Sequence, residues 1–178
     1  MKTDTQTIKL LDIDELSNGF PAITAAFGET LAEAGALCLE SQGHTQGQRI
    51  TINGDYSNEY LLHWQDVTDQ IRRTYNDEEV ATEYGAVGIA ILLTNKETGL
   101  SPIKRSKKGT GFDYWIGKET DIPLQERARL EISGIRCGND SAINTRVQIK
   151  KKQTDKSDRT SLPALISDSE SKKIRMKK

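Results

Sequence analysis

The sequence predicts an α/β protein in which helices flank a central mixed sheet. This prediction rests on an amphipathic helical stretch at 18–42, a cluster of β-like segments in the middle of the chain, and a second helical stretch at 141–153. The chain of 178 residues is long enough to bury a core without disulfides. We therefore expect a single α/β domain at 1–166, followed by a basic, disordered tail at 167–178.

The N-terminal half is predicted to form a helix, a hairpin and a short second helix. Within 18–42, apolar residues from Ile23 to Cys38 recur every three or four positions, which is the helical period. An Asn-Gly turn signal between two β-like runs predicts a hairpin over 49–64. The segment 66–79 then returns to helical spacing.

Three consecutive strands are expected in the next part of the chain. The continuous apolar run 85–94 is typical of a strand that is buried on both faces. The segments 111–117 and 128–135 follow, and each carries an acidic residue within an apolar stretch. A helix over 141–153 and a final strand over 162–166 complete the predicted order.

The composition limits the expected location and partners. The 25 basic and 26 acidic side chains nearly cancel, so nucleic-acid binding requires a local basic patch. We expect that patch at Lys107, Lys150, Lys151 and Lys152, whose amines can contact phosphates. The N-terminus lacks the apolar core of a signal peptide, no segment approaches the length of a membrane span, and the two cysteines lack metal-pair spacing. A cytoplasmic protein without a membrane partner is therefore expected.

Asp113 lies in the aromatic segment 109–117, where an unpaired buried carboxylate is costly. If the strands 111–117 and 128–135 are neighbours, Asp113 and Glu131 converge on one face at the edge of the sheet. Two converging carboxylates repel each other unless a cation lies between them. Hard oxygen ligands suit Mg²⁺, with Mn²⁺ as a substitute, so the pair predicts a metal site.

The predicted order of helix, three strands, helix and strand, with acids in the second and third strands, resembles the PD-(D/E)XK, or restriction-endonuclease-like, nuclease superfamily. The resemblance covers about residues 18–166 and implies a restriction-endonuclease-like core. It also implies that Asp113 and Glu131 bind the metal, that the backbone near Ile132 supplies a further ligand, and that Glu33 is the glutamate sometimes contributed by the first helix. The strings KGTGFDYWIG and ARLEISGI also resemble uncharacterised bacterial proteins.

Ser133 departs from the superfamily pattern, which has a lysine two residues after the glutamate. That lysine positions the attacking water and offsets charge on the phosphate. If the site is active, another amine must replace it. The candidates are Lys107 and Lys108 before the second strand and Lys150 on the following helix, with Lys108 or Lys150 neutralising the phosphate.

A purely structural interpretation of the same residues is also open. The ion pairs that would neutralise the acids without a metal are Asp113 with Arg129 or Arg127, and Glu131 with Lys104 or Arg105. In this interpretation Ser133 simply precedes a bulge at Gly134. Trp115 fits the core better than a base-stacking platform.

Two functional hypotheses follow. The first is a Mg²⁺-dependent endonuclease that hydrolyses DNA phosphodiesters, and the superfamily resemblance suggests a role in antiviral defence. Because so small a domain offers little surface for reading sequence, we expect a second copy or an ATPase or helicase subunit to select the target. The alternative is a catalytically inactive nuclease-fold subunit that binds nucleic acid or serves in assembly, which Ser133 favours.

Overall fold

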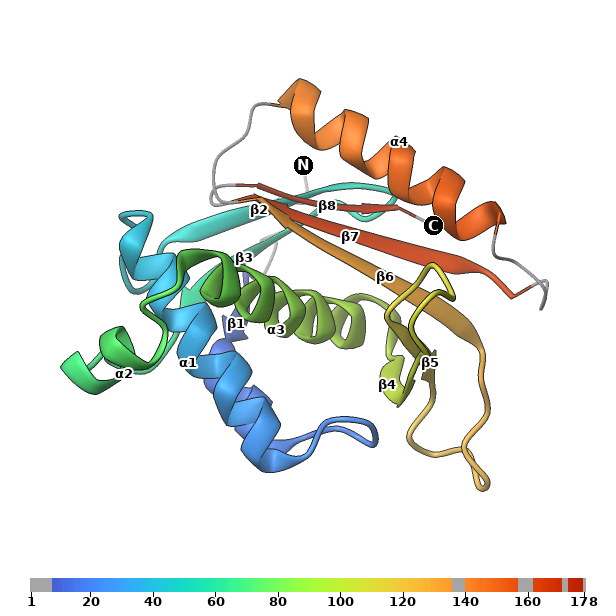
Figure 1. Cartoon of the computed structure of the whole chain (residues 1–178), viewed down its shortest axis with the longest axis horizontal. Coiled ribbons are helices and arrows are strands. Elements are labelled where there is room, and N and C mark those ends of the chain that lie inside the picture. Colours follow the sequence, from blue (N-terminus) through green and yellow to red (C-terminus); the bar gives the residue numbers. More distant parts are fainter. Residues whose placement is uncertain (1–7, 136–139, 157–161, 171–172, 178) are drawn as a thin grey trace, which may run out of the picture.

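A mixed sheet of eight strands carries helices on both faces, as the sequence predicts (Figure 1). The computed structural model describes residues 8–135, 140–156, 162–170 and 173–177. In chain order the strands are β1 (Lys9–Asp12), β2 (Arg49–Gly54), β3 (Asn58–His63), β4 (Ser101–Arg105), β5 (Tyr114–Gly117), β6 (Ala128–Ile135), β7 (Ala164–Glu170) and β8 (Lys173–Lys177). Across the sheet their order is β1-β3-β2-β8-β7-β6-β5-β4.

The helices divide between the two faces of the sheet. They are the 3-10 helix η1 (Ile13–Asn18) and the α-helices α1 (Ala25–Ser41), α2 (Asp69–Thr74), α3 (Glu78–Thr98) and α4 (Asp140–Lys156). Helices α1 and α3 pack together on one face, while α4 covers the other (Figure 1). Successive residues of β7 show the two layers, because Leu165 joins the main core and Ile166 packs in a separate cluster with Ile143 and Val147 of α4. No helix within the described ranges is long and apolar enough to cross a membrane.

The prediction of a strand at 85–94 is wrong, because this run lies inside α3. Asp77 begins the helix by accepting hydrogen bonds from the N–H groups of Glu79 and Val80, at 2.9 and 3.2 Å. Gly99 ends it in the left-handed conformation. Since α3 lies between α1 and the sheet, most of the run is buried, and the polar face that marks a helix in a sequence is missing.

The three consecutive strands are β4, β5 and β6, which form an antiparallel meander. Strand β4 lies outside the predicted strand segments, between 85–94 and 111–117, whereas β5 and β6 lie within the predicted segments. Helix α4 then connects β6 to β7, which pairs parallel to β6. The predicted hairpin over 49–64 is confirmed by the antiparallel pairing of β2 with β3, and α1 and α4 confirm the two predicted long helices.

The prediction of a disordered tail from residue 167 does not agree with the structure. Strand β7 continues to Glu170, and β8 pairs antiparallel to β7 and parallel to β2. Met176 of β8 is completely buried. The polar composition of this segment suggests disorder, but a strand in the middle of a sheet is held by main-chain hydrogen bonds, which composition does not reveal.

The buried carboxylate of Glu97 connects the C-terminal end of α3 to β3 of the hairpin through hydrogen bonds. Glu97 exposes 3% of its side chain and accepts hydrogen bonds from the Tyr60 hydroxyl and, at 2.6 Å, from the Asn58 amide. The Lys9 amine lies 3.9 Å from Oε1 of Glu97. Burial and the neighbouring Glu97 raise the pKa of the Tyr60 hydroxyl, so it remains a protonated donor. This network satisfies the buried charge and positions α3 against the sheet.

Candidate functional site

Asp113 is held immediately before β5 by main-chain hydrogen bonds on both sides. Its N–H donates to the Leu130 carbonyl at 2.8 Å, and its carbonyl accepts from the Ser106 N–H at 2.9 Å. Its carboxylate oxygen Oδ2 accepts a third hydrogen bond, 2.7 Å long, from the N–H of Ile132 in β6. The Asp113 side chain is therefore turned toward β6, which is the neighbour that the sequence analysis required.

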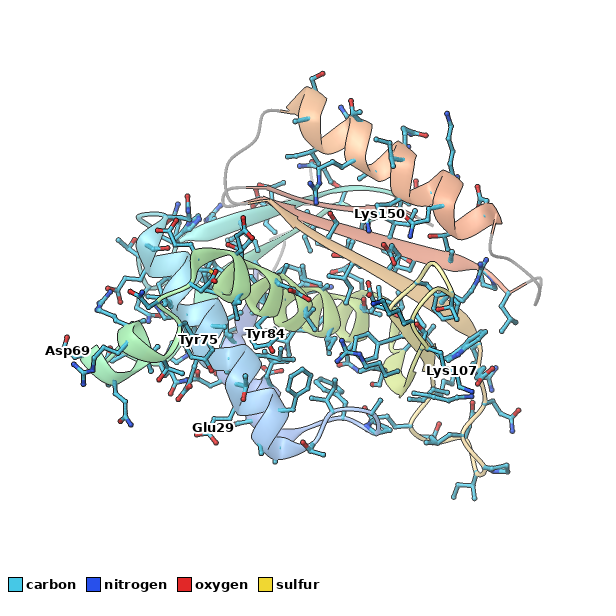
Figure 2. All side chains as sticks on the ribbon, in the orientation of Figure 1. Glu29, Asp69, Tyr75, Tyr84, Lys107 and Lys150 are labelled. Atoms are coloured by element: carbon cyan, nitrogen blue, oxygen red, sulfur yellow. The ribbon has the colours of Figure 1, made fainter. Side chains whose placement is uncertain are left out.

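Glu131, on β6, is the second acid of the site and exposes 4% of its side chain. The amine of Lys150, from α4, donates to Glu131 Oε1 at 2.5 Å. Figure 2 shows Lys150 on the α4 side of the sheet. The chain thus brings two carboxylates and one amine together from the start of β5, the middle of β6 and the centre of α4. The carboxyl groups of Asp113 and Glu131 also share a side-chain hydrogen bond, so the two acids lie within contact distance of each other.

The pKa of Glu131 reflects its burial and the nearby charges of Asp113 and Lys150. Burial, the largest cause, raises the pKa of its carboxyl to about 7. The hydrogen bond and charge of Lys150 lower that pKa, while the charge and side-chain hydrogen bond of Asp113 raise it. The balance means that a single amine does not fully compensate the two acids. A divalent cation between the two carboxylates would replace the hydrogen bond that they share and would favour ionised Glu131, and paired carboxylate oxygens are donors that suit Mg²⁺ or Mn²⁺.

This raised pKa predicts a pH-dependent stability in the absence of divalent cations. Because an unfolded glutamate has a pKa of about 4.3, the folded protein keeps a proton on Glu131 that the unfolded chain loses as pH rises toward 7. The contribution of Glu131 to the free energy of unfolding therefore falls between about pH 4.5 and pH 7. Urea unfolding in EDTA at pH 5 and pH 8 measures it, and Glu131→Gln is expected to remove this part of the decline. The same decline in Glu131→Gln would contradict the assignment, and Glu126→Gln, which changes an exposed glutamate, is the control.

A broad pocket of about 1370 Å³ surrounds these three groups. Basic side chains from β4, the β4–β5 loop, β6 and α4 line it: Arg105, Lys107, Lys108, Arg129 and Lys150. Of the predicted nucleic-acid contacts, Lys107 and Lys150 line the pocket, as does the predicted phosphate-neutralising Lys108. Lys151 and Lys152 lie on α4 outside this lining. The pocket therefore combines an acidic centre with a basic wall.

The loop between β4 and β5 forms much of that wall. Gly109 and Gly111 have φ values of 89° and 81°, a left-handed region that other residues rarely adopt, so the loop turns sharply at both. The Thr110 hydroxyl donates to the Lys107 carbonyl at 2.8 Å, and the Thr154 hydroxyl of α4 donates to the Gly111 carbonyl at 3.3 Å. These contacts hold Lys107 and Lys108 at the edge of the site.

The structure does not bring Glu33 to this site. Its carboxylate, on α1, accepts a hydrogen bond from the Tyr75 hydroxyl at 3.0 Å. Figure 2 shows Tyr75 on the α1–α2 side of the molecule, well away from Lys107 and Lys150. Glu83 of α3 lines the pocket instead. The error follows from the wrong assignment of 85–94, since the helix that directly precedes the three strands is α3 and not α1.

The two residues after Glu131 have structural partners. Ile132 uses its N–H to orient Asp113, while the proposed role of the nearby backbone as a metal ligand stays a prediction. Ser133 is 7% exposed, and its hydroxyl accepts from Arg146 Nη2 of α4 at 2.5 Å. The position that carries a lysine in the superfamily pattern is therefore occupied by a short polar side chain bound to α4.

The cations proposed as structural partners of the acids have other contacts. Arg127 forms a bidentate pair with Asp121, at 2.7 and 2.9 Å, and Lys104 pairs with Glu126 at 2.7 Å. Arg129 is 2% exposed and donates to the Thr154 carbonyl at 2.9 Å and to the Leu162 carbonyl at 2.7 and 3.2 Å. Arg105 lies over the ring of Tyr114, with 5.7 Å between the guanidinium carbon and the ring centroid. The Lys150 amine, in contrast, contacts Glu131 directly.

A second acidic cluster lies elsewhere, at the junction of β1 and β3. Asp12, Asp14 and His63 each place one potential ligand atom within 4.8 Å of the others. His63 Nδ1 lies 3.0 Å from Asp12 Oδ1, and this hydrogen bond is the main cause that raises the pKa of His63. Asp14 accepts from the Gln65 N–H at 3.0 Å. These hydrogen bonds give the cluster a structural role, because they connect β1 and the start of η1 to the end of β3 and the residues that follow it.

Comparisons with protein-family models, with curated proteins and with solved structures gave no match.

Proposed function

We propose that this chain is a Mg²⁺-dependent endonuclease that hydrolyses DNA phosphodiesters and has a restriction-endonuclease-like core. The observation that carries the proposal is the convergence of Asp113, Glu131 and Lys150 in a pocket with a basic wall. Two acids and one amine form the catalytic set of the superfamily that the sequence resembles. Here the amine comes from α4, which supports Lys150 as the replacement for the lysine missing at position 133.

The order of elements supports the same proposal. From α3 onward the chain runs through one helix, three antiparallel strands, a second helix and a strand parallel to the third. This order agrees with the helix, three strands, helix and strand of the proposed core, with α3 rather than α1 as the first helix. In this arrangement Glu83 takes the role first assigned to Glu33.

The residues of the pocket divide the chemistry among them. Asp113 and Glu131 would hold the ion, which when bound supplies a Lewis acid and lowers the pKa of a water. Asp113 is oriented by Ile132, and Glu131 by Lys150. Lys150 places its positive charge beside the acids, where it can stabilise charge on a scissile phosphate. Lys107 and Lys108 hold the flanking phosphates through charge.

The experiment is cleavage of supercoiled plasmid by the purified chain in Mg²⁺, in Mn²⁺ and in EDTA. Nicking or linearisation is expected with either ion and none in EDTA. Asp113→Ala and Glu131→Ala are expected to abolish cleavage, whereas Glu33→Gln, which changes an acid outside the pocket, is expected to retain it. Cleavage in EDTA, or full activity in either alanine variant, would overturn the proposal.

A non-catalytic nucleic-acid clamp is the second candidate, and the direct contact of Lys150 with Glu131 favours it. In this case the amine serves to neutralise a buried acid. Intact plasmid in both ions, together with DNA binding that weakens steeply as salt rises, would support the clamp. Antiviral defence and a second subunit that selects the target stay predictions.

A further inference from the structure

Trp115 is a large aromatic side chain placed beside the acids of the pocket. Its neighbours in β5, Tyr114 and Ile116, are 2% and 1% exposed, because they point into the core on the α3 face. Trp115 points to the opposite face together with Asp113, since side chains alternate along a strand. Trp115 is only partly buried and lines the same pocket as Asp113 and Glu131. The sequence predicts a core position for Trp115, whereas in the structure its side chain forms part of the pocket wall.

The indole is supported by fixed groups on its own face of the sheet. The ring of Phe112 meets it edge to face, with 4.7 Å between the ring centroids and 78° between the planes. Phe112 in turn lies beneath the Arg129 guanidinium, 5.9 Å from its ring centroid, and Arg129 is bonded to two carbonyls. Trp115 also lies opposite Lys104 and Arg129 in the strand register. Lys104 is paired with Glu126 and Arg129 is buried, so the basic residues available beside the indole are those of the pocket wall, such as Lys107 and Lys108. A supported aromatic beside basic side chains is the composition that single-stranded nucleic-acid sites use.

Phosphate binding alone does not require such a ring. Lysine and arginine suffice for the backbone of a duplex, in which each base face is covered by the next base pair. An unpaired base, in contrast, has an open π face, and stacking it on an aromatic side chain contributes about 1–3 kcal/mol per base. We infer that the pocket takes single-stranded DNA, and that a base next to the scissile phosphate stacks on Trp115. The inference deepens the proposed function and rests on it.

Tryptophan fluorescence tests the inference without cleavage. The chain has two tryptophans, and the other, Trp64, is 5% exposed, so a Trp64→Phe background reports on Trp115 alone. In EDTA, this protein is titrated with an oligothymidylate of about 15 nucleotides, with a blunt duplex of equal length, and with a strand of abasic spacers that carries the same number of phosphates. The expected result is saturable quenching by oligothymidylate only.

Affinity supplies the second measurement. By fluorescence anisotropy of labelled strands, Trp115→Ala is expected to bind oligothymidylate about 5- to 150-fold more weakly, which corresponds to the stacking free energy of one base. It is expected to bind the abasic strand as the parent does. Trp115→Phe keeps an aromatic face, so its affinity for oligothymidylate should lie between those of the parent and Trp115→Ala. Thermal unfolding of Trp115→Phe checks that the protein remains folded.

The outcomes separate this inference from the proposed function. Equal affinity for the abasic strand and oligothymidylate, or an unchanged affinity in Trp115→Ala, overturns base stacking. Tighter binding of duplex than of single strand overturns it as well, even if plasmid cleavage in Mg²⁺ still depends on Asp113 and Glu131. Failure of metal-dependent cleavage on both the plasmid and a single strand, with quenching and the Trp115 effect intact, removes the nuclease and leaves a single-strand binding site.

Discussion

Replacing Lys150 with methionine is expected to slow Mg²⁺-dependent DNA cleavage by about 10²- to 10³-fold. Methionine keeps most of the length of the side chain and removes the charge. The loss has two physical sources, because the amine contacts Glu131 at 2.5 Å and is the candidate to offset charge on the phosphate. Single-turnover rates at saturating enzyme measure it, since they report the chemical step separately from DNA affinity.

Lys152→Met is the matched control, because it removes the same charge from an exposed position on α4. It is expected to change salt-dependent binding slightly and to leave the single-turnover rate close to that of the parent. Urea unfolding of both variants shows whether loss of the Lys150 contact has disturbed the fold around buried Glu131. Equal single-turnover rates for the two variants would contradict the role assigned to Lys150.

Gly28→Ala is expected to destabilise the protein by about 3 kcal/mol, although alanine is the better helix former by about 1 kcal/mol. Gly28 lies in α1, where the helix crosses η1. A Cβ added there would lie 1.9 Å from the carbonyl oxygen of Leu16 and 2.8 Å from its carbonyl carbon. Because the obstacle is backbone, it cannot rotate away, and the two helices must separate. The midpoint of urea unfolding is the measurement.

Gly35→Ala in the same helix separates this steric effect from helix propensity. Its added Cβ would meet the Ile13 side-chain methyl at 3.3 Å, and a methyl group can shift slightly. We therefore expect a change within about 1 kcal/mol of the parent protein. Equal stabilities for the two variants would show that the close approach of α1 to η1 does not limit the fold.

The acids of the site could be proposed from the sequence because local rules determine them. Asp113 and Glu131 lie in short segments bounded by turn residues, and alternation along two neighbouring strands is enough to place both on one face. From the sequence, Lys150 was one of three amines that could replace the missing lysine, together with Lys107 and Lys108. The choice depends on how α4 lies across β6 and β7, which is a long-range packing result.

A comparison of Glu33 with Glu83 shows why the sequence does not identify the glutamate that lines the pocket. Both are glutamates on predicted or observed helices, and nothing in their neighbouring residues distinguishes them. The segment of Glu83 continues into an apolar run whose period does not separate a buried helix from a strand. Only the packing of α3 between α1 and the sheet makes it a helix and brings Glu83 to the pocket.

The sequence alone was enough to predict the α/β class, the hairpin, two long helices and the meeting of Asp113 with Glu131 on one face, because these depend on local patterns. The tertiary structure decided that 85–94 is helical, that the polar C-terminal segment supplies a central strand, and that Trp115 faces the pocket. Those outcomes depend on which surfaces meet after the chain has folded. Burial and main-chain pairing between distant segments then override local preference.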